Sequence, residues 1–442
     1  MDERYWITTL GCPKNEVDSQ KLIGRLTAGG YEPAQEPGEA DLVVVNTCAF
    51  IDAAREESIE TILDLDSLRK LGSRLVVTGC LAERSGQELA AALDEIDLVA
   101  GFGVPVEMKT IRRVVRTGQD DLSSEGLLHS FDLLELPRPP GTAPWAYVKI
   151  AEGCDRRCGF CAIPSFRGKQ RSRPLASILV EIEALKVREV VLVAQDLASY
   201  GHDRTEGERP HESSGSGIVE LIGAAAQRVD RVRLLYLYPS SLNDRLVEAI
   251  VGTGVPYFDL SLQHASGPLL RRMRRWGDAN RFLERIGRIR RLEPGAVFRS
   301  SFILGYPGET EEDHDELLRF IEEANLDWAG FFTFSREDGT LAAGLGEQVP
   351  SSLAFERLRE CSELQEAITA RRRQELVGTR TEVLVDRPGR ARSYREAPEI
   401  DGIVRVPPSI TAGWIGSVRL IGSVGPDLEA EPAFELVGRS AP

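Results

Sequence analysis

The chain has 442 residues, seven cysteines and a net charge of −15, so we expect two or three domains rather than one. The negative charge argues against a surface that binds nucleic acid non-specifically, and seven cysteines are too few for a disulfide scaffold in a chain of this length. Because the sequence has no run of eighteen apolar residues and no charged-then-apolar leader, it predicts a cytoplasmic protein without a membrane segment.

The first unit, residues 1–118, alternates short β-rich runs with helical runs. The expected strands are 5–10, 41–46, 74–78 and 97–100, and the expected helices are 16–28, 53–69, 83–92 and 106–115. This alternation predicts a parallel sheet with helices on both faces.

Three cysteines follow the first three of these strands: Cys12, Cys48 and Cys80. In an open parallel sheet the loops beyond the carboxyl ends of the strands gather at one edge, where ligands bind. A small buried cysteine is the common alternative for any one of them. Since all three follow consecutive strands at the same end, the pattern predicts an iron–sulfur cluster held by three cysteines.

Residues 119–144 form the expected linker, and its proline-rich part, 136–144, favours an extended chain. The second unit, residues 145–377, again alternates strands and helices. Its expected strands are 146–150, 189–194, 231–238, 258–262, 297–304 and 329–334, and a last helix covers 351–377. Six such units favour a partial (β/α)6 barrel over a flat sheet, with the functional site at the carboxyl ends of the strands.

The loop after the first strand of this unit contains Cys154, Cys158 and Cys161 in the spacing C-x-x-x-C-x-x-C. Three thiolates so close together are typical ligands of an iron–sulfur cluster. A structural zinc site is the alternative, but zinc usually takes four ligands and no histidine lies within thirty residues downstream. The spacing, with Phe160 just before the last cysteine, resembles the signature of the radical S-adenosylmethionine (SAM) enzymes.

That resemblance implies a 4Fe–4S cluster whose open iron binds SAM and cleaves it to a 5′-deoxyadenosyl radical. Phe160 and residues at other strand ends then become candidates for SAM binding: Gln195, Gln263, Leu304 and Gly305. Gly305 would permit a close approach of the backbone. Glu309 and Thr310 beyond it could equally be caps of the following helix.

A dense arginine run lies between residues 271 and 291. A solvated helix face is the ordinary interpretation of such a run, and a phosphate-binding patch is the alternative.

The third unit, residues 378–442, has short strand patterns at 381–385, 402–406 and 417–421, which predict a small all-β module. From Arg380 to Pro442 it has eight arginines, no lysine and nine carboxylates, whereas a module that grips RNA would be expected to be more basic. As the only unit with neither cysteine set nor SAM motif, it is expected to recognise the substrate.

The order of these units resembles the methylthiotransferases, which have an N-terminal domain with three dispersed cysteines, a radical SAM core and a C-terminal TRAM domain. Five segments are similar to the branch that modifies a ribosomal protein: 9–19 (TLGCPKNEVDS), 149–154 (KIAEGC), 163–168 (IPSFRG), 262–266 (LQHAS) and 397–402 (APEIDG). Gln20 is a small departure, because a glutamate is expected there.

The resemblance implies an enzyme that adds a methylthio group to the β-carbon of an aspartate in protein S twelve of the small ribosomal subunit. It implies two 4Fe–4S clusters, SAM, and an electron donor such as flavodoxin or ferredoxin. The Cys154/Cys158/Cys161 cluster would generate the radical, and the Cys12/Cys48/Cys80 cluster would carry the sulfur.

Three alternatives stay open. The transfer-RNA branch, which acts on isopentenyladenosine, is the nearest of them. A non-catalytic iron–sulfur electron carrier is the second, although it leaves the barrel pattern unexplained. A zinc-scaffold protein is the third.

Overall fold

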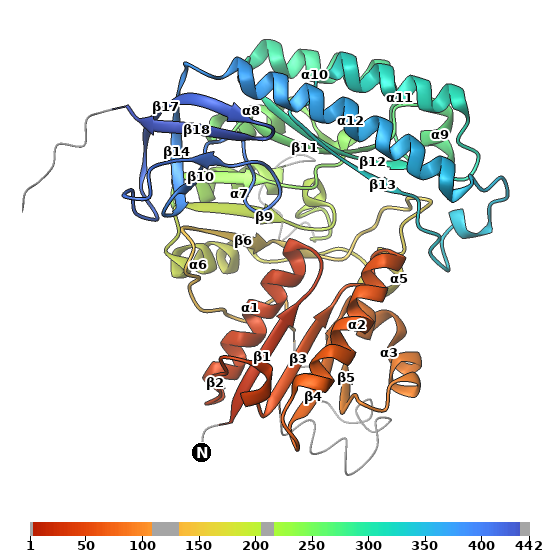
Figure 1. Ribbon diagram of the computed structural model, residues 1–442, viewed down its shortest axis with the longest axis vertical. Coiled ribbons are helices and arrows are strands. Elements are labelled where there is room, and N and C mark those ends of the chain that lie inside the picture. Colours follow the sequence, from red (N-terminus) through yellow and green to blue (C-terminus); the bar gives the residue numbers. More distant parts are fainter. Residues whose placement is uncertain (1–2, 108–131, 205–215, 434–442) are drawn as a thin grey trace, which may run out of the picture.

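The computed structural model describes residues 3–107, 132–204 and 216–433. Figure 1 shows a parallel sheet at the N-terminal end, a larger α/β unit above it, and a small β-barrel beside that unit. This is the mixed α/β architecture that the sequence predicts. None of the helices among the described residues combines the length and the apolar character that a membrane span requires.

The N-terminal unit has one five-stranded sheet in the order β2-β1-β3-β4-β5, and every pair in it is parallel. Its strands are β1 (Arg4–Thr9), β2 (Glu32–Pro33), β3 (Leu42–Thr47), β4 (Arg74–Gly79) and β5 (Leu98–Ala100). Its helices are α1 (Pro13–Ala28), the 3-10 turn η1 (Pro37–Glu39), α2 (Asp52–Leu68) and α3 (Cys80–Ala92).

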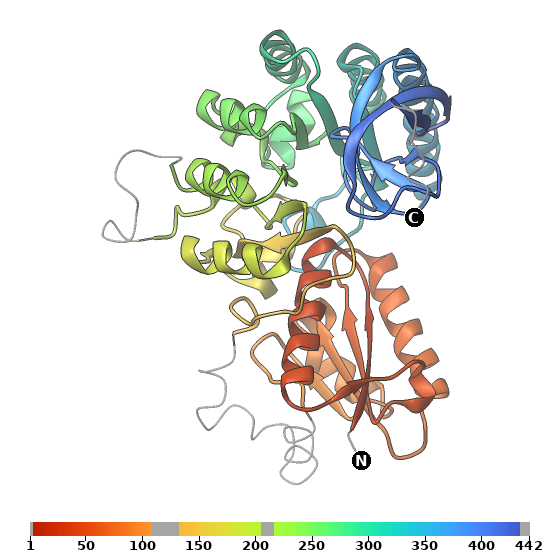
Figure 2. The ribbon, with the colours of Figure 1, turned by 90° about the vertical axis from the view of Figure 1, so that its left-hand side faces the viewer.

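Alternation along β3 explains why helices cover both faces of this sheet. Val44 packs with Leu22 and Leu26 of α1, whereas Val43 and Val45 pack on the other face with α2 and α3. Successive side chains of a strand point to opposite faces, so a run of valines serves two cores at once. Figure 2 shows the sheet edge-on between its helices.

The central unit has six parallel strands in two hydrogen-bonded groups, β10-β9-β6 and β11-β12-β13. A single parallel bridge between Leu237 and Leu260 joins the groups into a partial barrel. The strands are β6 (Trp145–Lys149), β9 (Glu189–Val193), β10 (Arg231–Leu234), β11 (Tyr257–Gln263), β12 (Val297–Leu304) and β13 (Trp328–Thr333). A short antiparallel pair, β7 (Ala151–Glu152) and β8 (Arg171–Ser172), follows β6.

Helices cover the outside of this barrel and bury one continuous apolar core against it. They are α5 (Ile163–Arg167), α6 (Leu175–Leu185), α7 (Ser216–Ala226), α8 (Asp244–Gly252), α9 (Gly267–Arg272), α10 (Ala279–Leu292), α11 (Glu311–Ala324) and α12 (Ser351–Glu375). The 3-10 turns are η4 (Leu197–Ser199), η5 (Pro239–Ser241) and η6 (Ala342–Gly344).

The C-terminal unit is a closed barrel in the order β14-β15-β16-β18-β17. Its strands are β14 (Arg380–Arg387), β15 (Arg390–Arg392), β16 (Val404–Arg405), β17 (Ile415–Val424) and β18 (Asp427–Pro432). The sequence predicts only three of them. In β18, acidic residues alternate with the buried Leu428 and Ala430, so its strand propensity is low although its inner face is apolar.

The segment between β15 and β16 packs into the interior of the partial barrel. Ala397 and Ile400 pack into the barrel interior with Tyr147, Tyr257 and Trp328. The small barrel is therefore joined to the central unit by a shared core.

The structure differs from the sequence-based expectations, or does not describe them, at the helix 106–115, the linker 119–144 and the end of the strand 231–238. Of the predicted helix 106–115, residues 108–115 lie outside the described residues, as do residues 119–131 of the linker. The described end of the linker packs on the protein, since Arg138 is buried and donates to Glu181 at 2.8 Å. The predicted strand 231–238 ends at Leu234, because Tyr236 has a left-handed φ of 66° that a regular strand does not allow.

Candidate active site between the N-terminal sheet and the barrel

The cysteine loop after β6 is folded by backbone hydrogen bonds to distant segments. The amide of Cys154 donates to Gly168 O at 3.1 Å, and the amide of Gly159 donates to Met273 O at 2.8 Å. Gly153 is required at the start of the loop, because its φ is 82° and a Cβ there would lie 2.1 Å from Lys169 O. The loop is therefore held from both sides by backbone contacts.

The structure brings the three thiols of this loop together. Cys154 and Cys158 each interact electrostatically with Cys161, and all three side chains are partly exposed. Burial raises the pKa of Cys154 to about 11 and that of Cys161 to about 12. The amide of Arg156 donates to Cys154 Sγ at 3.4 Å, and Arg275 Nη1 donates to Cys158 Sγ at 3.3 Å. These N–H donors would stabilise negative sulfur.

The second set of cysteines gathers at the carboxyl edge of the N-terminal sheet. Cys12 caps the N-terminus of α1, Cys48 follows β3, and Cys80 begins α3 after β4. Gly11 keeps the first two close, since a Cβ at residue 11 would lie 2.8 Å from Cys48 Sγ. Asn15 braces the edge by donating from Nδ2 to Leu10 O at 2.9 Å and to Thr47 O at 3.0 Å.

The three thiols at this edge differ in their electrostatics. Burial raises the pKa of Cys48 to about 11, and it also raises that of Cys80 although Arg167 opposes this. For Cys12, burial is outweighed by the cations Lys14 and Arg167, so its pKa lies below the usual value. Cys12 is thus the thiol of this set that ionises most readily.

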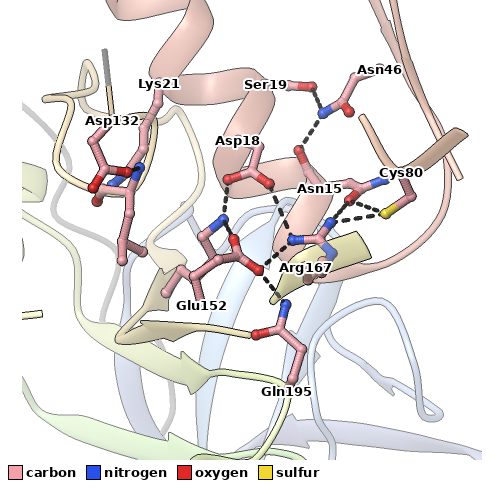
Figure 3. Close-up of polar contacts among 12 residues, drawn as sticks. Asn15, Asp18, Ser19, Lys21, Asn46, Cys80, Asp132, Glu152, Arg167 and Gln195 are labelled. Atoms are coloured by element: carbon pink, nitrogen blue, oxygen red, sulfur yellow. Dashed lines mark hydrogen bonds and ion pairs between the residues drawn. The ribbon is translucent and has the colours of Figure 1, made fainter. Parts of the chain in front are cut away.

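Arg167, at the end of α5, connects the two units at this edge (Figure 3). It is buried, and it donates to Cys80 Sγ at 2.9 Å, to Asn15 Oδ1 at 2.8 Å and to Glu152 Oε1 at 2.7 Å. Burial opposes ionisation of Glu152, but Arg167 and Lys149 outweigh it and hold the pKa of this carboxyl well below its usual range.

Lys149 extends the network back to α1. It is buried, pairs with Asp18, and donates to Glu152 Oε2 at 2.6 Å. Gln195 Nε2 donates to Glu152 Oε1 at 2.7 Å, as Figure 3 also shows. Buried charges of opposite sign therefore fix the N-terminal sheet against the carboxyl ends of the barrel strands.

The five candidates for SAM binding all lie at or near the carboxyl end of the barrel, with different surroundings. Gln195 follows β9, and its Oε1 is buried without a hydrogen-bond partner among the described residues. Gln263 ends β11 with a φ of 75°, and Phe160 packs against the barrel core.

Leu304 and Gly305 have structural partners at the end of β12. Leu304 O accepts from the amide of Phe334 at 2.8 Å, and the amide of Gly305 donates to Glu309 Oε2 at 2.5 Å. A Cβ at residue 305 would lie 2.6 Å from the Cβ of Ala354 in α12. The close approach that this glycine permits is thus to a helix of the same unit.

Glu309 and Thr310 act as capping and packing residues in this structure. Thr310 forms a capping box with Asp313 at the start of α11, and Glu309 is buried in an ion pair of 3.0 Å with Arg357. Both arrangements stabilise the helix start.

Most of the arginine run between residues 271 and 291 is occupied by contacts within the protein. Arg285 and Arg290 donate to backbone carbonyls, and Arg272 and Arg288 form ion pairs with carboxylates. Arg275 reaches the cysteine loop, which the sequence alone did not reveal. The ordinary interpretation, a solvated face, holds for six exposed arginines of the run: Arg271, Arg272, Arg274, Arg281, Arg288 and Arg291. The phosphate patch stays a prediction.

Arg167 and Lys14 are further residues of the site to which the sequence analysis assigned no role. Both lie inside segments that resemble the methylthiotransferases, Lys14 in 9–19 and Arg167 in 163–168. This position within the resembling segments was the only signal in the sequence that could have pointed to them. Their partners are too distant in sequence to be read from local pattern.

The donor set suits iron–sulfur clusters. All seven cysteines are free thiols. Within residues 3–107, 132–204 and 216–433, no three thiol, imidazole or carboxylate groups converge on a position for a single metal ion. Thiolates that hold a cubane surround the cluster and each bind a different iron, so they need not converge in this way. Two sets of three mutually interacting thiols, with N–H donors on the sulfurs, match that requirement.

Three family models match the chain. Residues 4–101 match the family described as Uncharacterized protein family UPF0004, residues 148–321 match the Radical SAM superfamily, and residues 377–432 match the TRAM domain. Among solved structures, the radical S-adenosylmethionine methyltransferase TsrM from Kitasatospora setae has a TM-score of 0.51 and 14% sequence identity, with 77% of each chain covered. This likeness concerns the fold.

Curated relatives named ribosomal protein uS12 methylthiotransferase RimO match nearly the whole chain, and three of them serve as examples. The protein from Cutibacterium acnes is 38% identical over 97% of each chain. The one from Anaeromyxobacter is 42% identical over 91% of this chain and 87% of its own. The one from Akkermansia muciniphila is 40% identical over 96% of this chain and 99% of its own. The chain belongs to the ribosomal protein uS12 methylthiotransferases, a radical SAM family.

Proposed function

We propose that this protein adds a methylthio group to the β-carbon of an aspartate in ribosomal protein uS12, in the cytoplasm. The observation that carries this proposal is the meeting of two cysteine sets from two units at one junction, with Arg167 bonded to both units. A reaction that attacks an unactivated C–H bond and also delivers sulfur needs two centres near one substrate carbon.

We assign one 4Fe–4S cluster to Cys154, Cys158 and Cys161 and a second to Cys12, Cys48 and Cys80. SAM is assigned to the carboxyl end of the barrel, with contacts from Phe160, Gln195, Gln263, Leu304 and Gly305. The unpartnered oxygen of Gln195 supports this placement best among the five, because a buried acceptor without a donor costs free energy until a ligand supplies one. Bound there, these groups would supply one-electron cleavage of SAM and the sulfur to be transferred.

The chain's own residues would position and protect these groups. Arg167, Glu152 and Lys149 hold the two units at a fixed separation through buried ion pairs. Arg275 and the amide of Arg156 donate to the sulfurs of the barrel loop. The shared core with Ala397 and Ile400 fills part of the barrel interior with apolar side chains. Excluding water from a site protects a reactive intermediate from side reactions.

We propose domain limits that follow from the same assignment: 1–118 for the N-terminal domain, 119–144 for the linker, 145–377 for the radical SAM core and 378–442 for the TRAM domain. The family matches at 4–101, 148–321 and 377–432 support these limits. The reaction consumes electrons, so we propose a small donor such as flavodoxin or ferredoxin as a second partner beside uS12.

The test of the function is mass spectrometry of uS12 from cells with and without the gene. We expect a methylthio mass increase on one aspartate that disappears with the gene and returns with the intact gene. Complementation by a Cys154→Ala variant should fail, whereas Cys361→Ala should succeed, because Cys361 is a buried thiol of α12 outside both cysteine sets. A mass increase that persists without the gene would exclude this function. Analysis of transfer RNA from the same cells tests the isopentenyladenosine alternative.

A further inference from the structure

We infer that Lys14 binds the carboxylate of the target aspartate and so places its β-carbon between the two cysteine sets. This inference rests on the proposed function and assigns its substrate-binding residue. It is drawn from the position of one cation that has no carboxylate partner among the described residues.

Lys14 meets the barrel across the boundary between the two units. It belongs to the first turn of α1 in the N-terminal unit, whereas Tyr236 follows β10 in the barrel. Lys14 Nζ lies 3.6 Å from the centroid of the Tyr236 ring. The ammonium also interacts electrostatically with the Cys12 thiol, and more weakly with Arg167 and Glu152. The cation thus lies beside one cysteine set and at the carboxyl end of the barrel that carries the other.

Lys14 has no carboxylate partner among the described residues, and its main electrostatic partner is the Cys12 thiol. Its neighbours at the same boundary, Lys21 and Lys149, form ion pairs with Glu181 and Asp18. For Lys14, no hydrogen bond or ion pair with a carboxylate is found among the described residues; its one direct contact is the ring face. An ammonium has three donors, so it retains capacity for an anion.

Helix stability does not explain the residue. The N-terminus of a helix is its positive end, so a cation in the first turn of α1 is unfavourable there. The same polarity favours a bound anion, because the field of the helix start and the ammonium then act together.

Tyr236 is held in a strained backbone conformation to make this contact. Its φ of 66° is rare for a bulky residue, and its amide donates to Asp259 Oδ2 at 3.0 Å. Asp259 is itself held by Arg299 at 3.1 Å. Strain that the surrounding structure maintains is typical of binding sites. The ring therefore provides a fixed platform for the ammonium.

An aspartate carboxylate fits these features better than a larger anion. Arg167, the other cation nearby, is already bonded to Glu152, Asn15 and Cys80. One remaining positive charge therefore matches one carboxylate. The carboxylate carbon of an aspartate is bonded directly to the β-carbon. A cation that binds this carboxylate beside Cys12 therefore brings the β-carbon close to the Cys12/Cys48/Cys80 set, to which sulfur transfer is assigned.

The test compares Lys14→Gln and Lys14→Arg with the wild-type protein and with Lys70→Gln, a control in the same unit whose ammonium pairs with Asp41 on the surface. Full-length proteins are reconstituted anaerobically, and methylthio product is measured on isolated uS12 over a range of concentrations. We expect Lys14→Gln to raise KM by about 10- to 100-fold, the loss of one charged contact, with kcat changed less. Lys14→Arg should recover part of the loss, and Lys70→Gln should match the wild type.

A second substrate separates binding from structural roles. With uS12 whose target aspartate is replaced by asparagine, the wild type should bind more weakly, whereas Lys14→Gln should bind the two forms equally. The iron content and visible absorption of Lys14→Gln should match the wild type. An unchanged KM, or loss of iron in Lys14→Gln, would overturn the inference, the latter because Lys14 would then serve the cluster. If the wild type makes no product on uS12, the proposed function itself fails.

Discussion

Arg167 of the barrel unit donates a hydrogen bond of 2.9 Å to the Cys80 thiol of the N-terminal unit. The same side chain donates to Glu152, two residues before the first cysteine of the barrel loop. One buried guanidinium therefore bonds to a cysteine of the N-terminal set and to the strand that leads into the barrel loop. The junction is thus joined by direct contacts between protein groups of the two units.

The first prediction concerns Arg167. Replacing it by Met should lower the free energy of unfolding by about 3–5 kcal/mol, because it leaves Glu152 buried with fewer charged partners. Arg171→Met is the matched control, since Arg171 is 58% exposed in its pair with Asp132 and should cost about 0–1 kcal/mol. Urea denaturation followed by circular dichroism measures both values. Equal stability of the two variants would contradict the role assigned to Arg167.

The second prediction concerns metal content. The intact protein, reconstituted without oxygen, should hold about eight irons per chain, as two cubanes require. Replacing Cys154, Cys158 and Cys161 together by Ala should remove about half of this iron and abolish SAM cleavage. Iron and sulfide analysis checks the content, and the Cys361→Ala variant is the control. Full iron content in the triple variant would disprove the assignment of these ligands.

The third prediction separates radical formation from sulfur transfer. Replacing Cys12, Cys48 and Cys80 by Ala should abolish methylthio product while SAM is still cleaved to 5′-deoxyadenosine. The reason is that the barrel loop is folded by contacts with Gly168 and Met273 of its own unit. Chromatography measures the amounts of methylthio product and of 5′-deoxyadenosine that each variant forms. Methylthio product at the wild-type level would show that sulfur comes from elsewhere.

The fourth prediction concerns the C-terminal barrel. Arg392 of β15 donates to Glu189 Oε2 at 2.9 Å, and both side chains are buried. Arg392→Met should therefore lower the free energy of unfolding by about 3–5 kcal/mol, whereas Arg405→Met, an exposed residue paired with Asp427, should change it by about 0–1 kcal/mol. Differential scanning calorimetry distinguishes them.

This contact also bears on how substrate recognition by the C-terminal module is tested. Removing residues 378–442 would take Arg392 from Glu189 and Ala397 from the barrel core. We therefore expect the truncated protein to lose SAM cleavage as well as product. Surface substitutions on the module, rather than its deletion, are the suitable test of recognition.

The fifth prediction concerns pH. Burial raises the pKa of Asp401 to about 6, although Arg299 and the hydroxyl of Tyr257 oppose the shift. A raised folded-state pKa means that the folded protein binds this proton more tightly than the unfolded chain does. The contribution of protonated Asp401 to the free energy of unfolding is therefore present below about pH 4 and is lost as the pH rises through 6. Asp401→Asn should remove this decline, which is on the order of 3 kcal/mol.

Asparagine is a close replacement at residue 401. Tyr257 donates at 2.6 Å and the Ala397 amide at 2.8 Å to the same oxygen, so one amide oxygen can accept both bonds. Asp427→Asn, at a partly exposed residue of the small barrel, is the control. Denaturation of each variant at pH 4, 5, 6 and 7 gives the comparison, and parallel curves for Asp401→Asn and the wild type would contradict the assigned shift.

Much of the fold could be predicted from the sequence, because periodicity reports which face of an element is buried. The valine run of β3 and the strand–helix alternation around it sufficed for a parallel sheet with helices on both faces. The same reasoning predicted the six parallel strands of the central barrel. Since parallel strands share one carboxyl edge, it also placed Cys12, Cys48 and Cys80 at a common edge. Their role as cluster ligands stays a prediction.

Only the tertiary structure decided which charged groups meet. Arg167 and Cys80, Lys14 and Tyr236, and Arg392 and Glu189 are pairs from different units, and no local pattern in the sequence links their members. The end of β10 was likewise decided by Asp259, which holds Tyr236 in its left-handed conformation. The physical reason is that hydrophobic periodicity depends on neighbours two to four residues away. The partner of a buried charge depends on which distant surfaces the completed fold brings within hydrogen-bond distance.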